Sequence, residues 1–420
     1  MRIRFLLVIS LIPILVLLPE ACSQTTHDIS PTPDFTQTPT ITSLIVSNQN
    51  VSGEITMNQT WSGTIYVTGD IWMNESVTLT IMPGTTILIS AGSDDQEMGN
   101  ALSGNWQPDT MGSLYTEDYA KTHIEIVGRI VAMGEPDRLI RFTSNSPTPT
   151  YADWSEIRLY PGSKIDYSVV EYSGRAGIAW QSHTDVQDAN ITISNSVIQH
   201  VFWGGIVAGP GSWDIIANNI SDCGSEGIAI EPVAGEPYIA ENTITNSTVG
   251  IATIQGSSAT IDNNTLTDNI KGILSRGNDI ITNNTISCPS QTIHEQSYSG
   301  YTFPYMVEPP IILFTGILIA ENATTTIDFN NISDNQRGIA IGPNSLPTLT
   351  VRNNNFYKNA FNLWSDAYGV TIDAPNNWWG TVDSSEIANS IHDYYDDSNV
   401  GMVNFQPIAY IPIESAGIKK

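Results

Sequence analysis

Four aromatic residues lie close together in an irregular stretch of the chain, residues 288–310: Tyr298, Tyr301, Phe303 and Tyr305. Aromatic rings offer flat apolar faces, which suit the C–H faces of sugar rings. The stretch interrupts a regular repeat, and long loops without a repeat of their own are often functional. We therefore take these rings as candidate carbohydrate-binding residues. The alternative is that they fold back and pack on the neighbouring surface.

Two basic residues and one further ring complete the binding candidates. Lys271 and Arg337 each directly precede a Gly-Ile pair, and Trp106 lies in a second irregular stretch, residues 91–121. Cationic side chains at such places can bind an acidic sugar. The alternative is that they are charged only because turn residues are exposed to water.

Catalytic and metal-binding patterns are weaker. Oxygen-rich clusters can hold Ca²⁺, and the acidic residues bunch in two places: Asp94, Asp95 and Glu97, and then Asp393, Asp396 and Asp397. Neither bunch has the spaced ligand geometry of a calcium loop, so we expect solvated acidic turns and leave the metal open, with Ca²⁺ as the candidate. The six His residues lack metal-ligand spacing. Phosphate-binding, dinucleotide and nucleophile-elbow motifs are missing from the sequence, and we assign no catalytic residue.

A repeat of about 22 residues positions the candidates. Gly-Ile pairs begin at Gly227, Gly250 and Gly272, at steps of 23 and 22 residues. Asn residues recur with the same rhythm: Asn218, Asn242, Asn264, Asn284, Asn330 and Asn354. A fixed period of this length predicts a solenoid. The pieces between turns are short, β-branched and cut by Asn, Gly or Ser, which predicts strands rather than helices.

Stacked coils place equivalent residues on top of each other, with parallel strands about 4.8 Å apart. We expect an inward ladder of isoleucines: Ile228, Ile251, Ile273, Ile317 and Ile339. The recurring Asn residues should form an outer-turn ladder, because Asn tolerates a left-handed backbone and its amide can bond the coil above and below. The repeats resemble those of right-handed parallel β-helix proteins, the pectate-lyase-like superfamily. The implied fold is all-β, a single-stranded right-handed parallel β-helix solenoid with N-terminal cap coils and a short C-terminal helix cap.

The resemblance also implies where a site would lie. In polysaccharide enzymes of this fold the substrate cleft lies beside the turn that residues 288–310 leave, where lyases carry Ca²⁺-binding carboxylates and a basic residue, and hydrolases carry close Asp pairs. Here the residues that follow each Gly-Ile pair, and should point outward, are small and apolar: Ala179, Val207, Ala229, Ala252, Leu274, Leu318 and Ala340. This column favours a non-catalytic surface protein that presents loops to carbohydrate or another surface. A polysaccharide lyase or hydrolase acting on acidic glycans is the alternative.

The N-terminus has the features of an export signal. Residues 1–22 combine a basic start with an apolar stretch too short to span a membrane. They end in a phrase resembling a bacterial lipoprotein cleavage box, although Pro19 stands where that box has Leu. We expect lipidation of Cys22, with cleavage after Ser23 as the alternative. Residues 23–42 are rich in Ser, Thr and Pro and predict a disordered linker.

The remaining chain divides by rhythm. Residues 44–162 form the N-terminal cap and first coils, and residues 163–380 form the regular coils. Residues 381–412 form a C-terminal cap, in which Asp383 and Glu386 make a capping box and Ile387, Ile391 and Tyr394 follow at helical spacing.

Charge and cysteine content exclude several functions. The formal net charge is −27, with 16 Lys+Arg against 43 Asp+Glu, so a nucleic-acid partner is excluded and a membrane is reached only through an N-terminal lipid anchor. Coil spacing separates Cys223 from Cys288 by roughly 14 Å, so both thiols should be free. We expect an exported monomer, anchored as a lipoprotein at the cell surface or envelope, or else secreted, with polysaccharide as the candidate partner.

Overall fold

Alternation of buried aliphatic and outward polar residues shapes the strands. In Thr243–Thr245 and Thr265–Thr267 the central Ile244 and Leu266 are fully buried, while the flanking threonines face outward.

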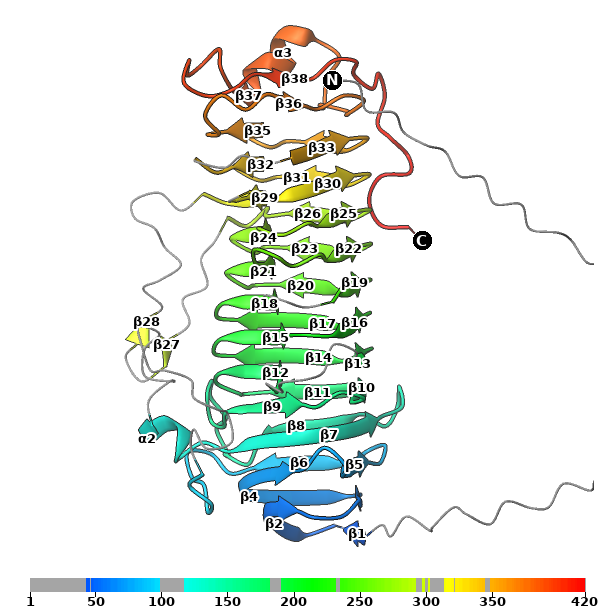
Figure 1. The fold of residues 1–420 in the computed structure, drawn as a ribbon, viewed down its shortest axis with the longest axis vertical. Helices are drawn as coiled ribbons and strands as arrows, with labels where there is room; N and C mark the ends of the chain where they lie inside the picture. Colours follow the sequence, from blue (N-terminus) through cyan, green and yellow to red (C-terminus); the bar gives the residue numbers. More distant parts are fainter. Residues whose placement is uncertain are drawn as a thin grey trace, which may run out of the picture. The chain divides into compact units, whose positions relative to one another are not determined.

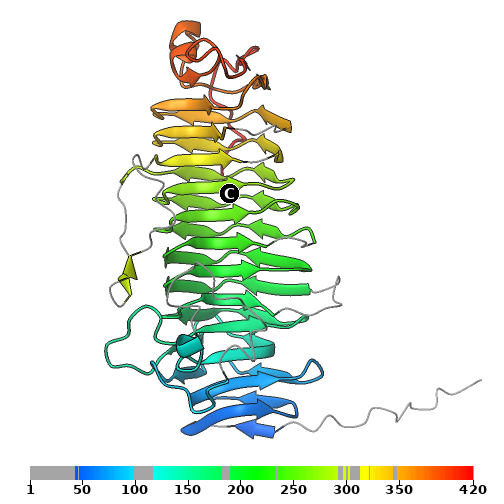
Figure 2. The same cartoon turned by 60° about the vertical axis from the view of Figure 1, so that its left-hand side comes forward.

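The computed structural model describes residues 43–45, 47–98, 117–181, 190–231, 235–291, 297–298, 301–302, 313–320, 322–343 and 348–419. All of them belong to one unit, Ile41–Lys420. Within it the strands stack in coils along one axis (Figure 1, and turned by 60° in Figure 2).

Each regular coil contributes one strand to each of three parallel columns. The first column contains β10 (Lys164–Asp166), β13 (Asn190–Ser194), β16 (Ser212–Ile216), β19 (Tyr238–Ala240), β22 (Thr260–Asp262), β25 (Ile280–Thr282), β30 (Thr324–Asp328) and β33 (Thr348–Arg352). The second contains β11 (Ser168–Glu171), β14 (Val197–Val201), β17 (Asn219–Cys223), β20 (Thr243–Thr245), β23 (Thr265–Thr267), β26 (Thr285–Ser287), β31 (Asn331–Ser333) and β34 (Asn355–Tyr357). The third contains β12 (Ala176–Trp180), β15 (Gly204–Ala208), β18 (Glu226–Ile230), β21 (Val249–Thr253), β24 (Lys271–Ser275), β29 (Thr315–Ile319), β32 (Arg337–Ile341) and β35 (Phe361–Ser365).

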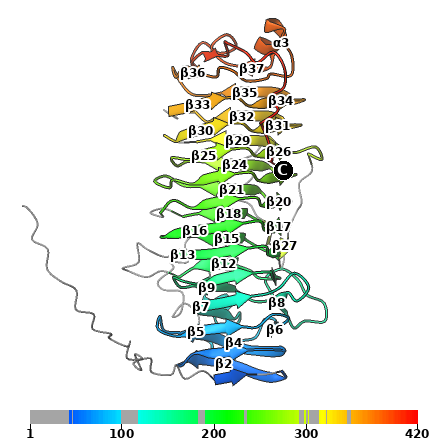
Figure 3. The same ribbon diagram turned by 90° about the vertical axis from the view of Figure 1, so that its right-hand side faces the viewer.

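The first coils are less regular and have longer strands. They contain β1 (Ser43–Ile45), β2 (Gln49–Ile55), β3 (Gln59–Trp61), β4 (Thr64–Met73), β5 (Thr78–Ile81), β6 (Thr86–Ile89), β7 (Glu125–Met133), β8 (Ile140–Ser144) and β9 (Glu156–Leu159). Strands β4, β7 and β9 continue the third column toward the N-terminus through parallel pairs with each other and with β12 (Figure 3).

The predicted isoleucine ladder is confirmed. Ile228, Ile251 and Ile273 are direct parallel partners, and Ile317 and Ile339 continue the stack. All five side chains are 0% exposed and belong to one hydrophobic core that runs through the coils. The fold inferred from the repeat is therefore present.

The asparagine ladder is also present, but it lies inside the turn rather than on its rim. Asn242 is typical: its side-chain oxygen accepts from the backbone N–H of Asn218 at 2.9 Å and from the Asn218 amide at 3.0 Å. The same pair of bonds joins Asn242 to Asn264, and the buried ladder ends at Asn377. The expected left-handed backbone of these Asn residues is wrong. The preceding residue takes that conformation, as at Glu241 with φ 60°, because the turn must bend before the amide can point inward.

Glycine is required at the corner between the second and third columns. An added Cβ at Gly250 would lie 2.6 Å from the carbonyl oxygen of Gly272, and one at Gly272 would lie 2.6 Å from that of Gly316. Real Cβ atoms do not approach a backbone oxygen this closely, so the stacked coils leave no room for a side chain there.

The C-terminal end is covered by β36 (Ile372–Asp373), α3 (Ser384–Asn389), β37 (Ile391–His392) and β38 (Val403–Asn404). Asp383 is the N-cap of α3 and accepts from the backbone N–H groups of Ser385 and Glu386. The expected helical spacing through Ile391 and Tyr394 is wrong, because the helix ends at Asn389 and Ile391 begins a strand. Trp379 is buried and stacks on Phe356 at 4.9 Å, where it covers the apolar end of the core.

The last described residues run back along the outside of the coils (red in Figure 1). The Asn355 side chain bonds both the N–H and the carbonyl of Ile413, and Asn331 donates to the carbonyl of Ala416. The backbone N–H of Lys419 donates to the Asn263 side chain. This segment therefore ties several coils together.

Two insertions leave the coils. Between β6 and β7 lies α2 (Glu117–Ala120), and between β26 and β29 lies an antiparallel pair, β27 (Ser297–Tyr298) and β28 (Tyr301–Thr302). None of the helices in the described ranges has the length and apolar character that a membrane span requires.

Candidate functional site

A pocket of about 180 Å³ opens on the outer face of the third column. Its floor is the predicted outward column: Ala179, Val207, Ala229 and Ala252 are successive parallel partners. The remaining lining residues come from the edges of this floor: Glu156, Arg158, Arg175, Ala176, Trp180, Trp203, Glu226, Ile230, Glu231, Ile254 and Arg276. The small floor residues matter because they leave space that larger side chains would fill.

The N-terminal end of the pocket is a buried ion-pair network. Arg175 donates to Glu125 at 2.7 Å, and Arg158 donates to Glu156 at 2.7 and 3.0 Å. The two pairs are cross-linked, since Arg158 also lies 3.7 Å from Glu125 and Arg175 lies 3.9 Å from Glu156. All four side chains are buried, so each charge depends on its partners for compensation.

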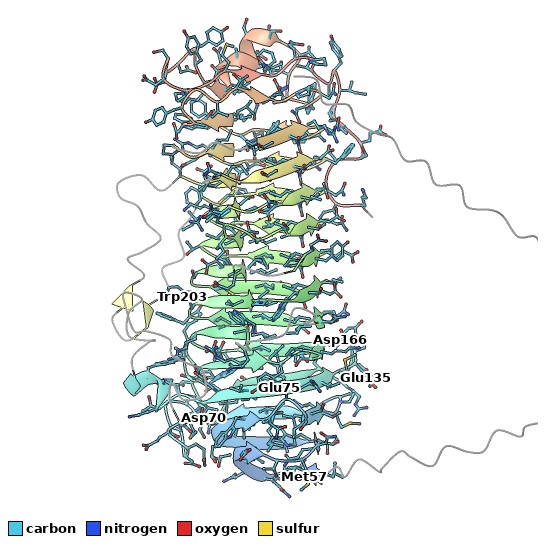
Figure 4. All side chains as sticks on the ribbon, in the orientation of Figure 1. Met57, Asp70, Glu75, Glu135, Asp166 and Trp203 are labelled. Atoms are coloured by element: carbon cyan, nitrogen blue, oxygen red, sulfur yellow. The ribbon has the colours of Figure 1, made fainter. Side chains whose placement is uncertain are left out.

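Two tryptophans contribute the aromatic surface of the pocket. The ring of Trp180 lies against Gly209, where an added Cβ would be 2.1 Å from the indole, so glycine is needed there to accommodate the ring. Trp203 precedes β15 and is half-buried at the edge of the column (Figure 4). Flat rings on two sides of a floor of small residues suit a sugar ring.

Two acidic residues and one arginine border the C-terminal part of the pocket. Burial raises the pKa of Glu226, partly offset by hydrogen bonds and by the charge of Arg276. Burial also raises the pKa of Glu231, and the charge of Glu226 adds to that rise. Both carboxyl groups therefore hold a proton to higher pH than an exposed glutamate would.

Beneath the arginines, carboxyl groups stack where the later coils have glycine. Asp70 accepts from the backbone N–H of Glu125 at 2.7 Å, and Asp94 accepts from that of Asp70 at 2.8 Å. Glu125 and Glu156 are direct partners in neighbouring strands. Burial raises the pKa of Asp70, and the charge of Asp94 adds to the rise. Burial likewise raises the pKa of Glu125, with the Arg158 charge acting against it.

The insertion after β6 closes over this network. Tyr119 of α2 stacks on His123 with ring centroids 3.8 Å apart, and its hydroxyl donates to the carbonyl of Trp154. The guanidinium of Arg175 lies 5.8 Å from the Tyr119 ring. Asp94, expected as part of a solvated acidic loop, is instead buried against Asp70, while Asp95 and Glu97 are exposed.

Lys271 and Arg337 occupy the positions that the repeat predicts but do not line the pocket. Thr315 lies between them in the same register column, so two strand spacings separate them. Arg337 packs over the ring of Trp364 at 3.9 Å and lies 3.8 Å from Asp366. The guanidinium of Arg337 therefore contacts Trp364 and Asp366 and does not reach the pocket.

The other predicted binding residues are not described. The backbones of Tyr298 and Tyr301 are paired in β27 and β28, but their side chains, like Phe303, Tyr305, Trp106 and Cys22, lie outside the described residues. Their roles stay predictions.

The residues missed from the sequence are those at the two ends of the outward column. The column does not start at Ala179, because Arg158 pairs with it from β9, and it does not stop at Ala340, because Trp364 follows. One signal was available: Asp70-Ile71, Glu125-Ile126 and Glu156-Ile157 replace Gly-Ile in the early coils. The irregular spacing of those coils hides the correspondence.

Metal ligands and thiols add little to the site. Within the described ranges, no group of three or more His, Cys, Asp or Glu residues is arranged to hold a metal ion. The Ca²⁺ expectation stays untested. Cys223 and Cys288 are free and buried, as predicted, and burial raises the pKa of both thiols, that of Cys288 to about 11.

Comparison with known proteins concerns the fold. The chain is similar to a mutant of the periplasmic alginate epimerase AlgG, at 11% identity and a TM-score of 0.41, over 85% of this chain and 78% of that one. It is also similar to the Dettilon tailspike protein, at 12% identity and a TM-score of 0.33, over 87% of this chain and 61%, less than two thirds, of that one. No curated protein matches. The family model described as "Right handed beta helix region" matches residues 176–390, and the chain therefore belongs to the right-handed β-helix family.

Proposed function

We propose that this protein is a non-catalytic, exported β-helix protein that binds an acidic carbohydrate in the third-column pocket. The observation that supports this most is the convergence of Trp180, Trp203 and three arginines on a floor of small residues. Indole faces pack on sugar rings, and guanidinium groups bind carboxylates with paired hydrogen bonds.

Basic side chains are few in this chain, and several of them gather at the pocket. The whole chain carries 43 acidic against 16 basic side chains, yet Arg158, Arg175 and Arg276 all line this one pocket. Glutamates line it as well, so the arginines offer a uronic acid directed N–H donors rather than a net positive charge.

The engagement of Glu156 favours binding over hydrolysis, because Glu156 is committed to Arg158 at 2.7 Å. Glu226 and Glu231 come from opposite ends of one extended segment, and the charge of Glu226 raises the pKa of Glu231.

The envelope location rests on the N-terminal sequence. Residues 1–22 would direct export, Cys22 would carry the lipid, and residues 23–42 would hold the coils away from the membrane. Mass analysis of the mature N-terminus tests this, since a diacylglyceryl mass on Cys22 supports the anchor and an unmodified terminus after Ser23 contradicts it.

A glycan array followed by calorimetry tests the binding. We expect the mature chain to bind uronic-acid oligosaccharides, and Trp180→Ala to weaken binding by tenfold or more. Trp364→Ala is the control, because Trp364 also belongs to the third column but packs on Arg337 outside the pocket. Equal losses in both variants, or silence across the array, would contradict the pocket as the binding site.

An enzyme acting on acidic glycans is the second candidate, and one observation favours it. Glu226 is partly buried in the pocket and burial raises its pKa, which is the direction of shift found in general acids. Incubation with polyuronates, with and without Ca²⁺, followed by mass analysis of the products would reveal it. Product formation that Glu226→Gln abolishes would overturn the non-catalytic proposal.

A further inference from the structure

The carboxyl groups under the arginines carry more negative charge than their partners can compensate. Asp70, Asp94, Glu125 and Glu156 are all buried, and the ion pairs given for the described residues set Arg158 and Arg175 against them. Fully ionised, the cluster would hold a net charge of about −2 away from water, which is strongly unfavourable. At least one proton must therefore reside on it.

Three oxygens identify where such a proton sits. Oδ2 of Asp70, Oδ2 of Asp94 and Oε2 of Glu125 are buried, and each lacks a hydrogen-bond partner within the described structure. The other oxygen of each aspartate accepts a backbone N–H, so Oδ2 of Asp70 and of Asp94 are available to carry hydrogen, whereas Oε2 of Glu125 lies 3.7 Å from Nε of Arg158. We name these three residues the acid stack.

The remaining charged groups near the stack come from neighbouring elements. Glu156 and Arg158 come from β9, and Arg175 comes from the turn before β12. His123 precedes β7, and its pKa is lowered mainly by burial, with Asp153 acting in the opposite direction. None of these brings further positive charge beyond the two arginines at neutral pH.

We propose that the acid stack stores a proton at neutral pH, and that an anionic ligand reaching Arg158 and Arg175 in the pocket binds with uptake of a further proton at Glu125. The second half rests on the proposed function. Glu125 is a positioning residue here: it holds Arg175 at 2.7 Å and approaches Arg158 at 3.7 Å. The raised pKa of Glu125 and of Asp70 is consistent with both halves.

The coupling follows from competition for the guanidinium groups. A ligand carboxylate beside Arg158 and Arg175 adds negative charge next to Glu125, which makes the ionised form of Glu125 less favourable. Binding and protonation therefore favour each other, and the effect is reciprocal. Affinity for an anionic ligand should rise as pH falls, by up to about tenfold per pH unit, while affinity for a neutral sugar should not.

Infrared spectroscopy of the free protein tests the stored proton. A protonated carboxyl group has a C=O stretch distinct from that of a carboxylate, and we expect this band in the wild type at pH 7. Asp70→Asn should remove or shift it, and Asp94→Asn is the second variant should the first fail to fold. Glu54→Gln, at an exposed position, is the control. A wild-type spectrum without the band overturns the stored proton.

Calorimetry in buffers of different ionisation enthalpy tests the coupling, with tetragalacturonate as the anionic probe and cellotetraose as the neutral one. We expect uptake of about one proton per tetragalacturonate bound and none with cellotetraose. Glu125→Gln should bind the probe without proton uptake. Wild-type binding without proton uptake overturns the coupling alone. Absence of any binding contradicts the proposed function and the coupling with it, while the infrared band still decides the stored proton.

Discussion

The early and the middle coils treat the same position in opposite ways. In the third column, the residue before each inward Ile is Glu125 or Glu156 in the early coils, and Gly227 or Gly250 in the middle ones. These residues lie in one continuous register from β7 to β21. The middle coils thus keep glycine at this position, whereas the early coils have a buried carboxyl group there.

The difference shows what regular and irregular coils each contribute: close packing in the first and space for buried charges in the second. Regular coils stack so closely at this corner that a Cβ at Gly250 would meet a carbonyl oxygen at 2.6 Å. Coils with longer strands and an insertion leave space, which Glu125 and Glu156 fill and which Arg158 and Arg175 compensate. Regular coils therefore build the floor of the pocket, and its buried ion pairs form where the regular coils meet the early ones.

The largest effect should come from placing a charge inside the regular stack. Ile251→Asp buries an uncompensated carboxylate among fully buried isoleucines, at a cost of several kcal/mol. We expect the cooperative thermal unfolding transition to be lost or strongly lowered. Thr245→Asp, on the outward side of the same coil, is the control. Unchanged melting of Ile251→Asp would contradict the internal ladder.

Breaking the asparagine ladder should rank next. Asn264→Ala leaves the backbone N–H and the side-chain amide of Asn242 without their acceptor, at a cost of about 3 kcal/mol for two buried donors. Denaturant unfolding would measure this loss. Thr265→Ala, one residue further and facing outward, should cost far less. Equal losses would mean that the ladder adds no specific stability.

A methyl group added at Gly250 tests whether the middle coils pack too closely for a side chain at this position. Gly250→Ala forces a Cβ against Gly272 and Leu266 and should destabilise by about 1–3 kcal/mol, measured by the same unfolding assay. Gly256→Ala cannot serve as the control, because Gly256 has a positive φ that strains any side chain even where there is room for it. Ala252→Gly, two residues further on the outward face, tests whether small changes in this strand matter by themselves. A stable Gly250→Ala variant would contradict the close-packed corner.

The smallest expected effect is on the pH dependence of stability, to which Asp70 of the early coils contributes. The native pKa of Asp70 is raised above its unfolded value, so its contribution to stability is complete at acid pH and is lost as pH rises toward the native pKa. Asp70→Asn should flatten the fall in the free energy of unfolding between acid and neutral pH, by at most about 1.4 kcal/mol per pH unit. Calorimetry across that range would show it. A variant slope equal to the wild type would mean that Asp70 titrates alike in both states.

Much of the fold was predictable because each coil repeats the residue pattern of its neighbours. The Gly-Ile steps and the outward column each predicted a register that the strand pairs confirm, and hydrogen bonds between the Asn residues confirm the Asn steps. The turn geometry was predicted one residue out of place, since a left-handed residue before Asn242 and one at Asn242 give the same spacing.

The pocket was not predictable in the same way. Arg175 and Glu125 are 50 residues apart and meet because β7, β9 and β12 stack as successive strands of the third column. Arg158 lies one repeat step before Ala179, but Glu156-Ile157 stands there in place of Gly-Ile, so the Gly-Ile pairs do not mark it.

The sequence by itself determined the period, the inward aliphatic positions and the Asn turns, because each coil contacts chiefly its neighbours and repeats their chemistry. Tertiary structure alone decided which charges share the pocket. Irregular coils bring together side chains that have no common spacing, and their compensation depends on distances that only the folded chain sets.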